Sequence, residues 1–176
     1  MKIAYKIIKC VLASVIGVFL ALNLWTLFAK NILHQDMPKI FGFTNAVVAS
    51  GSMEPAFEKD DFIIIKEQKK YNIGDVVCFK DGSSYTTHRI VGIENEKFIT
   101  KGDANNTNDT NAVEMSSVVG KVVAVWQHFG KVILFLHSYW GLMILFVIGL
   151  ALILLDPVID YLSNKKKSEV KDEKKV

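Results

Sequence analysis

Two long apolar stretches constrain this chain more than any other feature of its sequence. The first runs from Ile7 to Ala29 and the second from Val132 to Leu155. A helix needs roughly 20 apolar residues to cross the hydrocarbon core of a bilayer, and both stretches are long enough. The second stretch contains no charged residue. We therefore predict two transmembrane helices, the second of them over residues 132–155.

The first apolar stretch has two other interpretations, a cleaved signal peptide and the buried helix of a soluble core. It is longer than the apolar region of a typical signal peptide. It also lacks an evident small-x-small cleavage site followed by a polar mature start. We therefore expect an uncleaved anchor, with a short cytoplasmic stub before it, over residues 1–30.

Lysines flank both stretches and predict their orientation, because positive flanks favour the cytoplasmic side of a membrane. Lys2 and Lys6 precede the first stretch and Lys9 lies at its start, while six lysines follow the second: Lys165, Lys166, Lys167, Lys171, Lys174 and Lys175. We expect both termini in the cytoplasm, residues 31–131 on the outer side, and a charged tail over residues 156–176. The membrane is the cell membrane, or that of the endoplasmic reticulum in a eukaryote.

The net charge of +3 does not indicate a nucleic-acid partner. Residues 31–131 contain eleven Lys and Arg against thirteen Asp and Glu, so the outer segment is nearly neutral. The positive excess lies in the tails, where it determines topology and can contact anionic lipid. We expect the lipid bilayer as a partner, and no nucleic acid.

The outer segment has the pattern of a β domain. Short β-branched or aromatic runs alternate with turn residues over residues 43–49, 62–66, 75–79, 85–93, 98–100 and 118–126. No 3.6-residue periodicity of useful length appears between residues 40 and 126. We predict a mainly β, barrel-like domain over residues 31–131, flanked by the two transmembrane helices.

A candidate nucleophile lies in residues 50–55, which read SGSMEP. A hydroxyl nucleophile needs a base that takes its proton and donors that face the oxyanion. Gly51 allows backbone angles closed to other residues, which helps to expose Ser52. The Ser52 amide and the Ser50 hydroxyl are candidate oxyanion donors. An ordinary Ser, Gly and Pro loop explains the same residues, and the pattern alone does not decide.

His88 is the candidate base, because it alone of the four histidines lies well within the predicted β region. An imidazole can accept and return a proton near pH 7, although a hydrogen-bonded structural histidine is the alternative. A triad also needs a carboxylate that orients the imidazole. Asp103 and Asp109, in the polar tract of residues 101–111, are the candidates. A solvated surface loop is the alternative for that tract.

Neither a metal nor another cofactor is expected. The histidines are scattered, and the sequence contains no paired-cysteine motif and no His-x-x-x-His motif. The two cysteines, Cys10 and Cys78, fall at different predicted depths, so we expect no disulfide bond between them.

Four motifs in order resemble those of type I signal peptidases. They are SGSMEP at residues 50–55, GDVV at 74–77, HRI at 88–90 and KGD at 101–103. The chain is most similar to the endoplasmic-reticulum type found in eukaryotes, archaea and some Gram-positive bacteria. An N-terminal anchor and an optional C-terminal span also belong to that type, so the resemblance covers nearly the whole chain.

The resemblance implies a role for each candidate residue. Ser52 matches the nucleophile, and Ser50 matches the serine that completes the oxyanion hole. His88 stands where the bacterial type has a lysine base. Asp109 is the favoured partner of His88, and Asp103 matches a further important aspartate. Many relatives read Gly-Asp-Asn at this point, whereas Ala104 follows Asp103 here.

The implied function is that of a serine endopeptidase that removes signal peptides from exported preproteins at the outer membrane surface, with accessory subunits as further partners. Nearby apolar candidates for its specificity pockets are Val47, Val48, Met53 and Phe57. One alternative is a Ser/Lys peptidase that uses Lys66, Lys80 or Lys101 while His88 is structural. A non-catalytic membrane-anchored binding domain and a self-cleaving regulator are two others.

Overall fold

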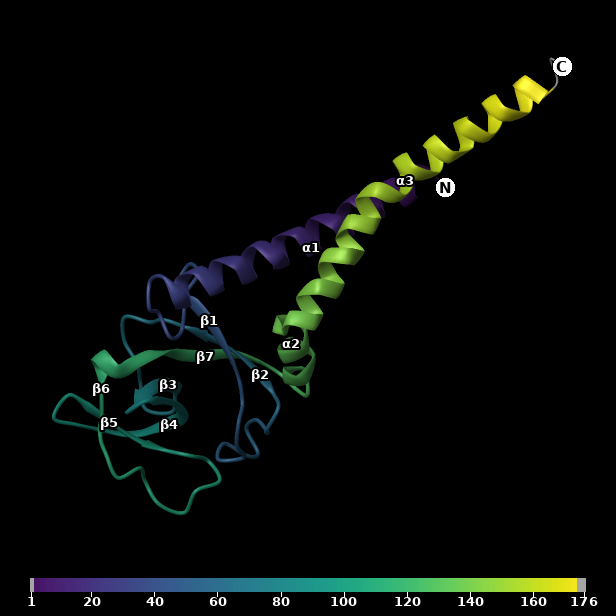
Figure 1. Cartoon of the computed structure of the whole chain (residues 1–176). Helices are drawn as coiled ribbons and strands as arrows, with labels where there is room; N and C mark the ends of the chain where they lie inside the picture. Colours follow the sequence, from purple (N-terminus) through teal and green to yellow (C-terminus); the bar gives the residue numbers. More distant parts are fainter. Residues whose placement is uncertain (1, 174–176) are drawn as a thin grey trace. The chain divides into compact units, whose positions relative to one another are not determined.

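A computed structural model describes residues 2–173, and these form two compact units. Of the described residues, unit 1 contains 2–28 and 136–173, and unit 2 contains 29–135. The elements in chain order (Figure 1) are α1 (Lys2–Asn31), β1 (Phe43–Val47), β2 (Phe62–Lys66), β3 (Val76–Asp81), β4 (Ser84–Glu94), β5 (Lys97–Lys101), β6 (Val113–Glu114), the 3₁₀ turn η1 (Met115–Ser117), β7 (Val118–Trp126), α2 (Gly130–His137) and α3 (Tyr139–Glu173). Lys174 and Lys175, which contribute to the predicted orientation, lie outside the described residues.

Two helices are long and apolar enough to cross a membrane. They cover Ala4–Asn31 and Tyr139–Val158, with mean hydropathies of 2.3 and 2.5. In each, only 6% of the most apolar window is buried, so neither is the enclosed core helix of a soluble domain. The structure thus contains the two apolar helices that the sequence predicts, while their orientation remains a prediction.

The second apolar stretch is divided into two helices at Ser138. The Ser138 hydroxyl accepts the Gly141 amide at 3.2 Å, and its carbonyl accepts the Leu142 amide at 2.9 Å. Serine is a preferred N-cap because its side chain satisfies a free amide of the first turn. The stretch predicted as one helix over residues 132–155 therefore contains most of α2 and the apolar part of α3.

Unit 1 contains an ion pair between its two long helices. Lys9 Nζ lies 2.6 Å from Asp156 Oδ2. Along the same two helices, a Cβ added to Gly149 would lie 3.3 Å from Ile16. A small residue at such a contact lets two apolar helices approach closely, and an ionisable residue in an apolar helix is stabilised by an opposite charge. The two helices of unit 1 thus pair through both shape and charge.

Unit 2 is built on one seven-stranded sheet in the order β1-β2-β7-β3-β4-β5-β6, with every neighbouring pair antiparallel. The predicted mainly β class is confirmed. The barrel-like shape needs correction, because β1 and β6 stand at opposite ends of the strand order and the sheet is open. Strand β6, only two residues long, was not predicted.

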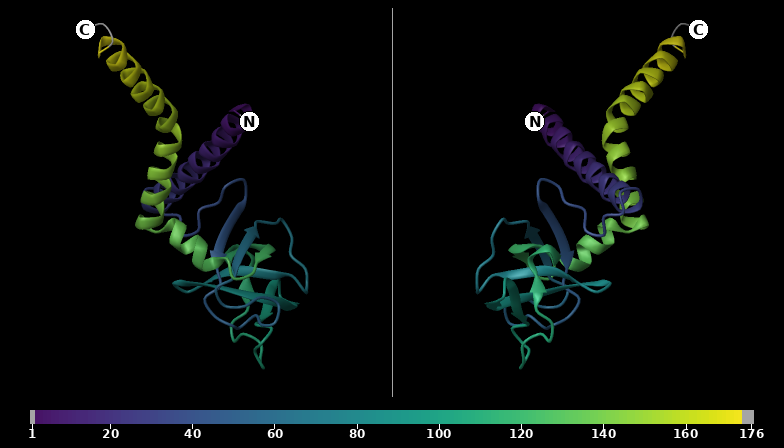
Figure 2. Two further views of the ribbon diagram at one scale, coloured as in Figure 1. Left: turned by 90° about the vertical axis from the view of Figure 1, so that its right-hand side faces the viewer. Right: turned by 90° about the vertical axis from the view of Figure 1, so that its left-hand side faces the viewer.

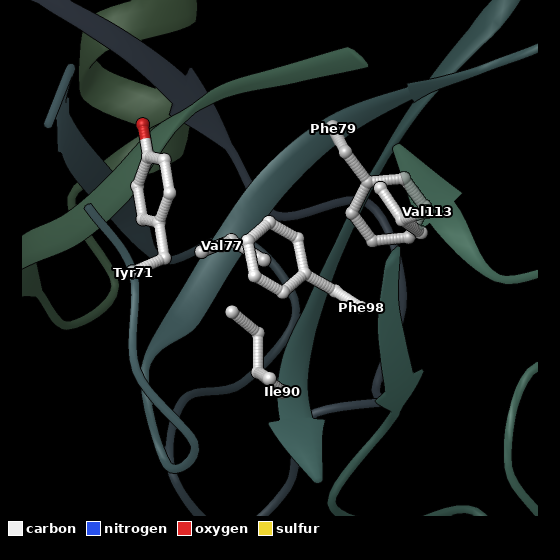
Figure 3. Close-up of a cluster of buried hydrophobic side chains, with 6 residues drawn as sticks. All are labelled: Tyr71, Val77, Phe79, Ile90, Phe98 and Val113. Atoms are coloured by element: carbon white, nitrogen blue, oxygen red, sulfur yellow. The ribbon is translucent and has the colours of Figure 1, made fainter. Parts of the chain in front are cut away.

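The sheet has hydrophobic side chains packed on both faces of β3. One buried cluster contains Tyr71, Val77, Phe79, Ile90, Phe98 and Val113 (Figure 3). The second contains Ile63, Ile65 and Cys78. Successive strand residues point to opposite faces, so Cys78 contacts one cluster while its neighbours on β3 contact the other. Burial raises the pKa of the Cys78 thiol, although a hydrogen bond with Thr87 opposes the shift.

Two long connections leave this sheet and approach each other. One joins β1 to β2 over residues 48–61, and the other joins β5 to β6 over residues 102–112. Figure 2 shows the second of them as an extended loop beyond the end of the sheet. The backbone of this loop contacts the first connection, because the Ala104 amide donates to the Ser52 carbonyl at 2.9 Å. The loops with the predicted functional residues therefore meet.

Candidate active site

The loop that carries Ser52 is held from several sides. Met53 and Phe57 are buried on either side of the Glu54–Pro55 peptide, which is cis. Asp61, fully buried, accepts the Glu58 amide at 2.8 Å and the His128 amide at 2.7 Å. A buried carboxylate with such partners fixes the backbone around it. Ser52 itself remains half-buried on this anchored loop.

His88 projects from the middle of β4 toward Ser52. Its Nε2 lies 3.2 Å from Ser52 Oγ, a distance at which the two atoms can share a proton. His88 is 8% exposed, and the Phe79 ring meets its imidazole edge-on at a centroid distance of 6.4 Å. Val77 of β3 pairs with His88 in the ladder, so the backbone of the histidine is fixed by the sheet.

The other ring nitrogen of His88 faces a carboxylate. Its Nδ1 lies 2.7 Å from Oδ2 of Asp109, which comes from the β5–β6 loop. The same oxygen accepts a hydrogen bond from the Thr100 hydroxyl at 2.7 Å. A carboxylate in this position selects the tautomer of the imidazole that can take a proton at Nε2. Ser52, His88 and Asp109 thus form a continuous chain of hydrogen bonds.

Asp103 lies in a different ion pair. Its two carboxylate oxygens accept bonds from Arg89 Nε at 2.8 Å and Nη2 at 2.6 Å, the bidentate geometry that favours Arg with a carboxylate. Hydrogen bonding and charge attraction from Asp103 raise the pKa of Arg89, with burial acting against them. Arg89 Nη1 also donates to the Gly74 carbonyl at 2.8 Å. The structure therefore brings Asp103 to Arg89 and Asp109 to His88.

Gly102 explains how the loop after β5 comes so close to the nucleophile. A Cβ added to this buried glycine would lie 2.6 Å from the Ser52 carbonyl oxygen, inside any real contact distance. Glycine is therefore required here for close approach of the two backbones. The predicted motif of residues 101–103 thus contributes both the ion pair of Asp103 and the space in which Ser52 is held.

Ser50 lies next to the candidate nucleophile. Its hydroxyl is exposed and donates to Ser52 Oγ over 3.4 Å, a long hydrogen bond. A second donor close to an attacked carbonyl is what an oxyanion requires. The position is compatible with the predicted oxyanion role of Ser50.

The three lysines considered as alternative bases have other surroundings. Lys66 Nζ lies 5.0 Å from the centre of the Phe43 ring. Lys80 Nζ pairs with Asp36 at 3.2 Å. Lys101 follows Thr100 on β5, and successive side chains of a strand point to opposite faces. Since Thr100 faces Asp109, the Lys101 side chain leaves the sheet on the other side.

A cavity of about 360 Å³ is lined in part by Ser52 and His88. All four apolar candidates from the sequence line it, namely Val47, Val48, Met53 and Phe57. Ile63, Cys78 and the β4 residues from Tyr85 to His88 complete most of its wall. A cavity that combines apolar walls with placed polar groups is the usual form of a binding site.

Two contact residues of the site were not predicted from the sequence. Thr100 and Arg89 bind the two loop aspartates, yet neither residue type is distinctive in a strand. The only local signal is position. Arg89 follows His88 directly, and Thr100 directly precedes the Lys-Gly-Asp motif.

Replacement of the two aspartates is expected to lower kcat by different amounts. Asp109→Asn is expected to lower kcat by about 10⁴-fold, because an amide can hold the imidazole in the wrong tautomer. Asp103→Asn is expected to lower it only about 10- to 100-fold, through displacement of the loop that contacts Ser52. Steady-state kinetics on both variants measures the difference. Equal losses, or a larger loss for Asp103→Asn, would reverse the assignment of the two carboxylates.

Comparison with known proteins gives several relatives. No family model matches the chain. It is 40% identical over 89 residues to signal peptidase I W of Bacillus subtilis, covering 46% of this chain and 47% of the relative. The signal peptidase complex catalytic subunits SEC11 of Metarhizium acridum and Verticillium alfalfae are 30% and 32% identical over 126 residues. Those matches cover 61% of this chain and 73% of each relative.

A serine hydrogen-bonded to a histidine, which is itself held by a carboxylate, defines the class of serine hydrolases. The sheet and two apolar helices further define a serine hydrolase with candidate membrane anchors. The relatives add the family. This chain belongs to the type I signal peptidases, which are serine endopeptidases, and it resembles their endoplasmic-reticulum type. It spans about half the length of the Bacillus relative.

Proposed function

We propose that this chain is a membrane-anchored signal peptidase that cleaves signal peptides from exported preproteins. The observation that carries the proposal is the chain of hydrogen bonds from Ser52 through His88 to Asp109, next to a cavity with apolar walls. The names of the relatives support the same activity, since each is a signal peptidase or its catalytic subunit.

In the proposed reaction, Ser52 Oγ attacks the carbonyl carbon of the scissile peptide while His88 Nε2 takes the hydroxyl proton. Asp109 stabilises the imidazolium that forms. The Ser52 amide and the Ser50 hydroxyl donate to the oxyanion of the tetrahedral intermediate. His88 then gives its proton to the leaving amine, which becomes the new N-terminus of the mature protein. Water, activated by the same histidine, hydrolyses the acyl-enzyme.

The cavity beside Ser52 supports selection of small residues before the cut. Its walls include Val48 and Met53, which line the same cavity as Ser52. We propose that the first and third residues before the cut bind here. A large side chain would have to displace packed groups, which is costly in a rigid site.

The flanking lysines support the proposed location. With basic ends inside, both termini lie in the cytoplasm and unit 2 lies on the outer side of the membrane. The tether would hold the enzyme at the depth at which a preprotein presents its cleavage site, which raises their effective concentration. SEC11 relatives are named as subunits of a complex, so we include accessory subunits among the proposed partners.

The proposal is tested by incubating the full-length protein, in lipid vesicles, with a purified preprotein. Mass spectrometry should find one cut at the junction of signal and mature sequence, and Ser52→Ala protein serves as the blank. A matched preprotein with leucine in place of alanine immediately before the cut should be cleaved at least about 100-fold more slowly. Cleavage at scattered positions, or none with any preprotein of the host, would contradict the proposed function.

A further inference from the structure

Thr100 is a completely buried polar residue whose side chain contacts the triad. It lies on β5, with none of its surface exposed, and pairs with Ile90 in the ladder. A buried hydroxyl must find a hydrogen-bond partner, or its burial is costly. The partner of Thr100 is the Oδ2 atom of Asp109, at 2.7 Å.

Thr100 holds the backbone of Asp109 as well as its side chain. The Thr100 carbonyl accepts the Asp109 amide at 2.8 Å. Asp109 otherwise lies within a run of exposed polar loop residues, and its own side chain is 23% exposed. A carboxylate in that position can turn toward water unless something fixed opposes the rotation. The two hydrogen bonds between Thr100 and Asp109 connect the loop to β5, which lies between β4 and β6 in the sheet.

We propose that Thr100 is a positioning residue of the catalytic triad, and that its hydroxyl fixes the carboxylate of Asp109 against His88. The hydroxyl donates to the same oxygen that faces His88 Nδ1, so one atom of Asp109 is held from both sides. A hydrogen bond to an ionised acceptor is stronger than one between neutral groups. Thr100 does not contact the substrate or the reacting atoms, and it acts through Asp109.

The test compares Thr100→Val, which keeps the shape and removes the donor, with Thr100→Ser, which keeps the donor. Thr100→Val is expected to lower kcat about 10- to 100-fold with KM nearly unchanged, because the geometry of the triad is lost and not the substrate cavity. Thr100→Ser should stay within about 3-fold of wild type, since the charged hydrogen bond survives. Thr44→Val is the matched control, a buried threonine on β1 away from the triad.

A double-mutant cycle separates positioning from a general structural role. In the Asp109→Ala background, Thr100→Val should have almost no further effect on kcat, because its partner is gone. An equal loss in both backgrounds, or a loss in Thr100→Ser as large as in Thr100→Val, would overturn the proposal. Circular dichroism verifies folding, and Thr100→Ala replaces Thr100→Val in the cycle if the valine variant does not fold.

The inference rests on the proposed function, and the two can fail separately. If Ser52→Ala cleaves the preprotein as well as wild type, the proposed function fails. If Ser52→Ala is inactive while Thr100→Val matches wild type in kcat, only the role of Thr100 is wrong.

Discussion

Replacement of Ser52 by alanine is expected to lower kcat for preprotein cleavage by about a million-fold. Without Oγ there is no atom within reach of both a scissile carbonyl and His88 Nε2, which lies 3.2 Å from that oxygen in the wild type. Substrate binding should be preserved, because the substitution removes only the Ser52 hydroxyl and leaves the apolar residues that line the cavity unchanged. The measurement is single-turnover cleavage of a labelled preprotein, with binding followed separately by fluorescence anisotropy.

Two other serines provide matched controls for this result. Ser50→Ala removes a candidate oxyanion donor on the same loop and should cost about 10²- to 10³-fold. Ser83→Ala changes an exposed serine in the β3–β4 turn and should leave cleavage unchanged. A Ser52→Ala protein that retains more than about 1% of wild-type kcat would rule out Ser52 as the nucleophile.

Replacement of His88 by alanine should cost nearly as much as the loss of Ser52 itself. Neither residue functions without the other, so the double variant should be no slower than either single one. His34→Asn is the matched control, because His34 is exposed and its φ of 53° is tolerated by asparagine. The measurement is kcat for the three variants with one preprotein. Additive losses in the double variant would show that the two side chains act independently.

The lysine alternatives give the opposite pattern. If Lys66, Lys80 or Lys101 were the base, its replacement by methionine would abolish cleavage while His88→Ala retained it. With His88 as base, each methionine variant should keep wild-type kcat within a few-fold. Lys66 and Lys80 are engaged with Phe43 and Asp36, and these contacts support the second expectation.

The sequence predicts the positions of the strands in this chain better than it predicts whether the sheet closes into a barrel. The short apolar runs of β2 and β3, each bounded by polar or turn residues, indicate strands because that pattern is local in the sequence. Whether the sheet closes into a barrel depends on pairing between its two edge strands, β1 and β6, which are far apart in the chain. Strand β6 escapes prediction for a related reason, since its two residues form a strand only by pairing with β5.

In the candidate site, too, residues are recognisable by their type, whereas their contacts depend on the folded chain. The serine motif and His88 stand out because their residue types are distinctive for chemistry. Asp103 and Asp109 are six residues apart in one polar tract, and only the folded loop determines which carboxylate meets the imidazole. Thr100 gives no signal of its own, because a threonine in a strand is ordinary until its partner is known.

The bond between the Ala104 amide and the Ser52 carbonyl has a consequence for motion. It joins the loop of the nucleophile to the loop that carries Asp109, which is itself fastened to β5. Neither loop can open without breaking contacts of the other, so we expect the two to open as one cooperative unit. Displacement of either loop is therefore expected to move Ser52 and Asp109 out of place together. A state in which only one of the two loops is correctly placed should not be populated.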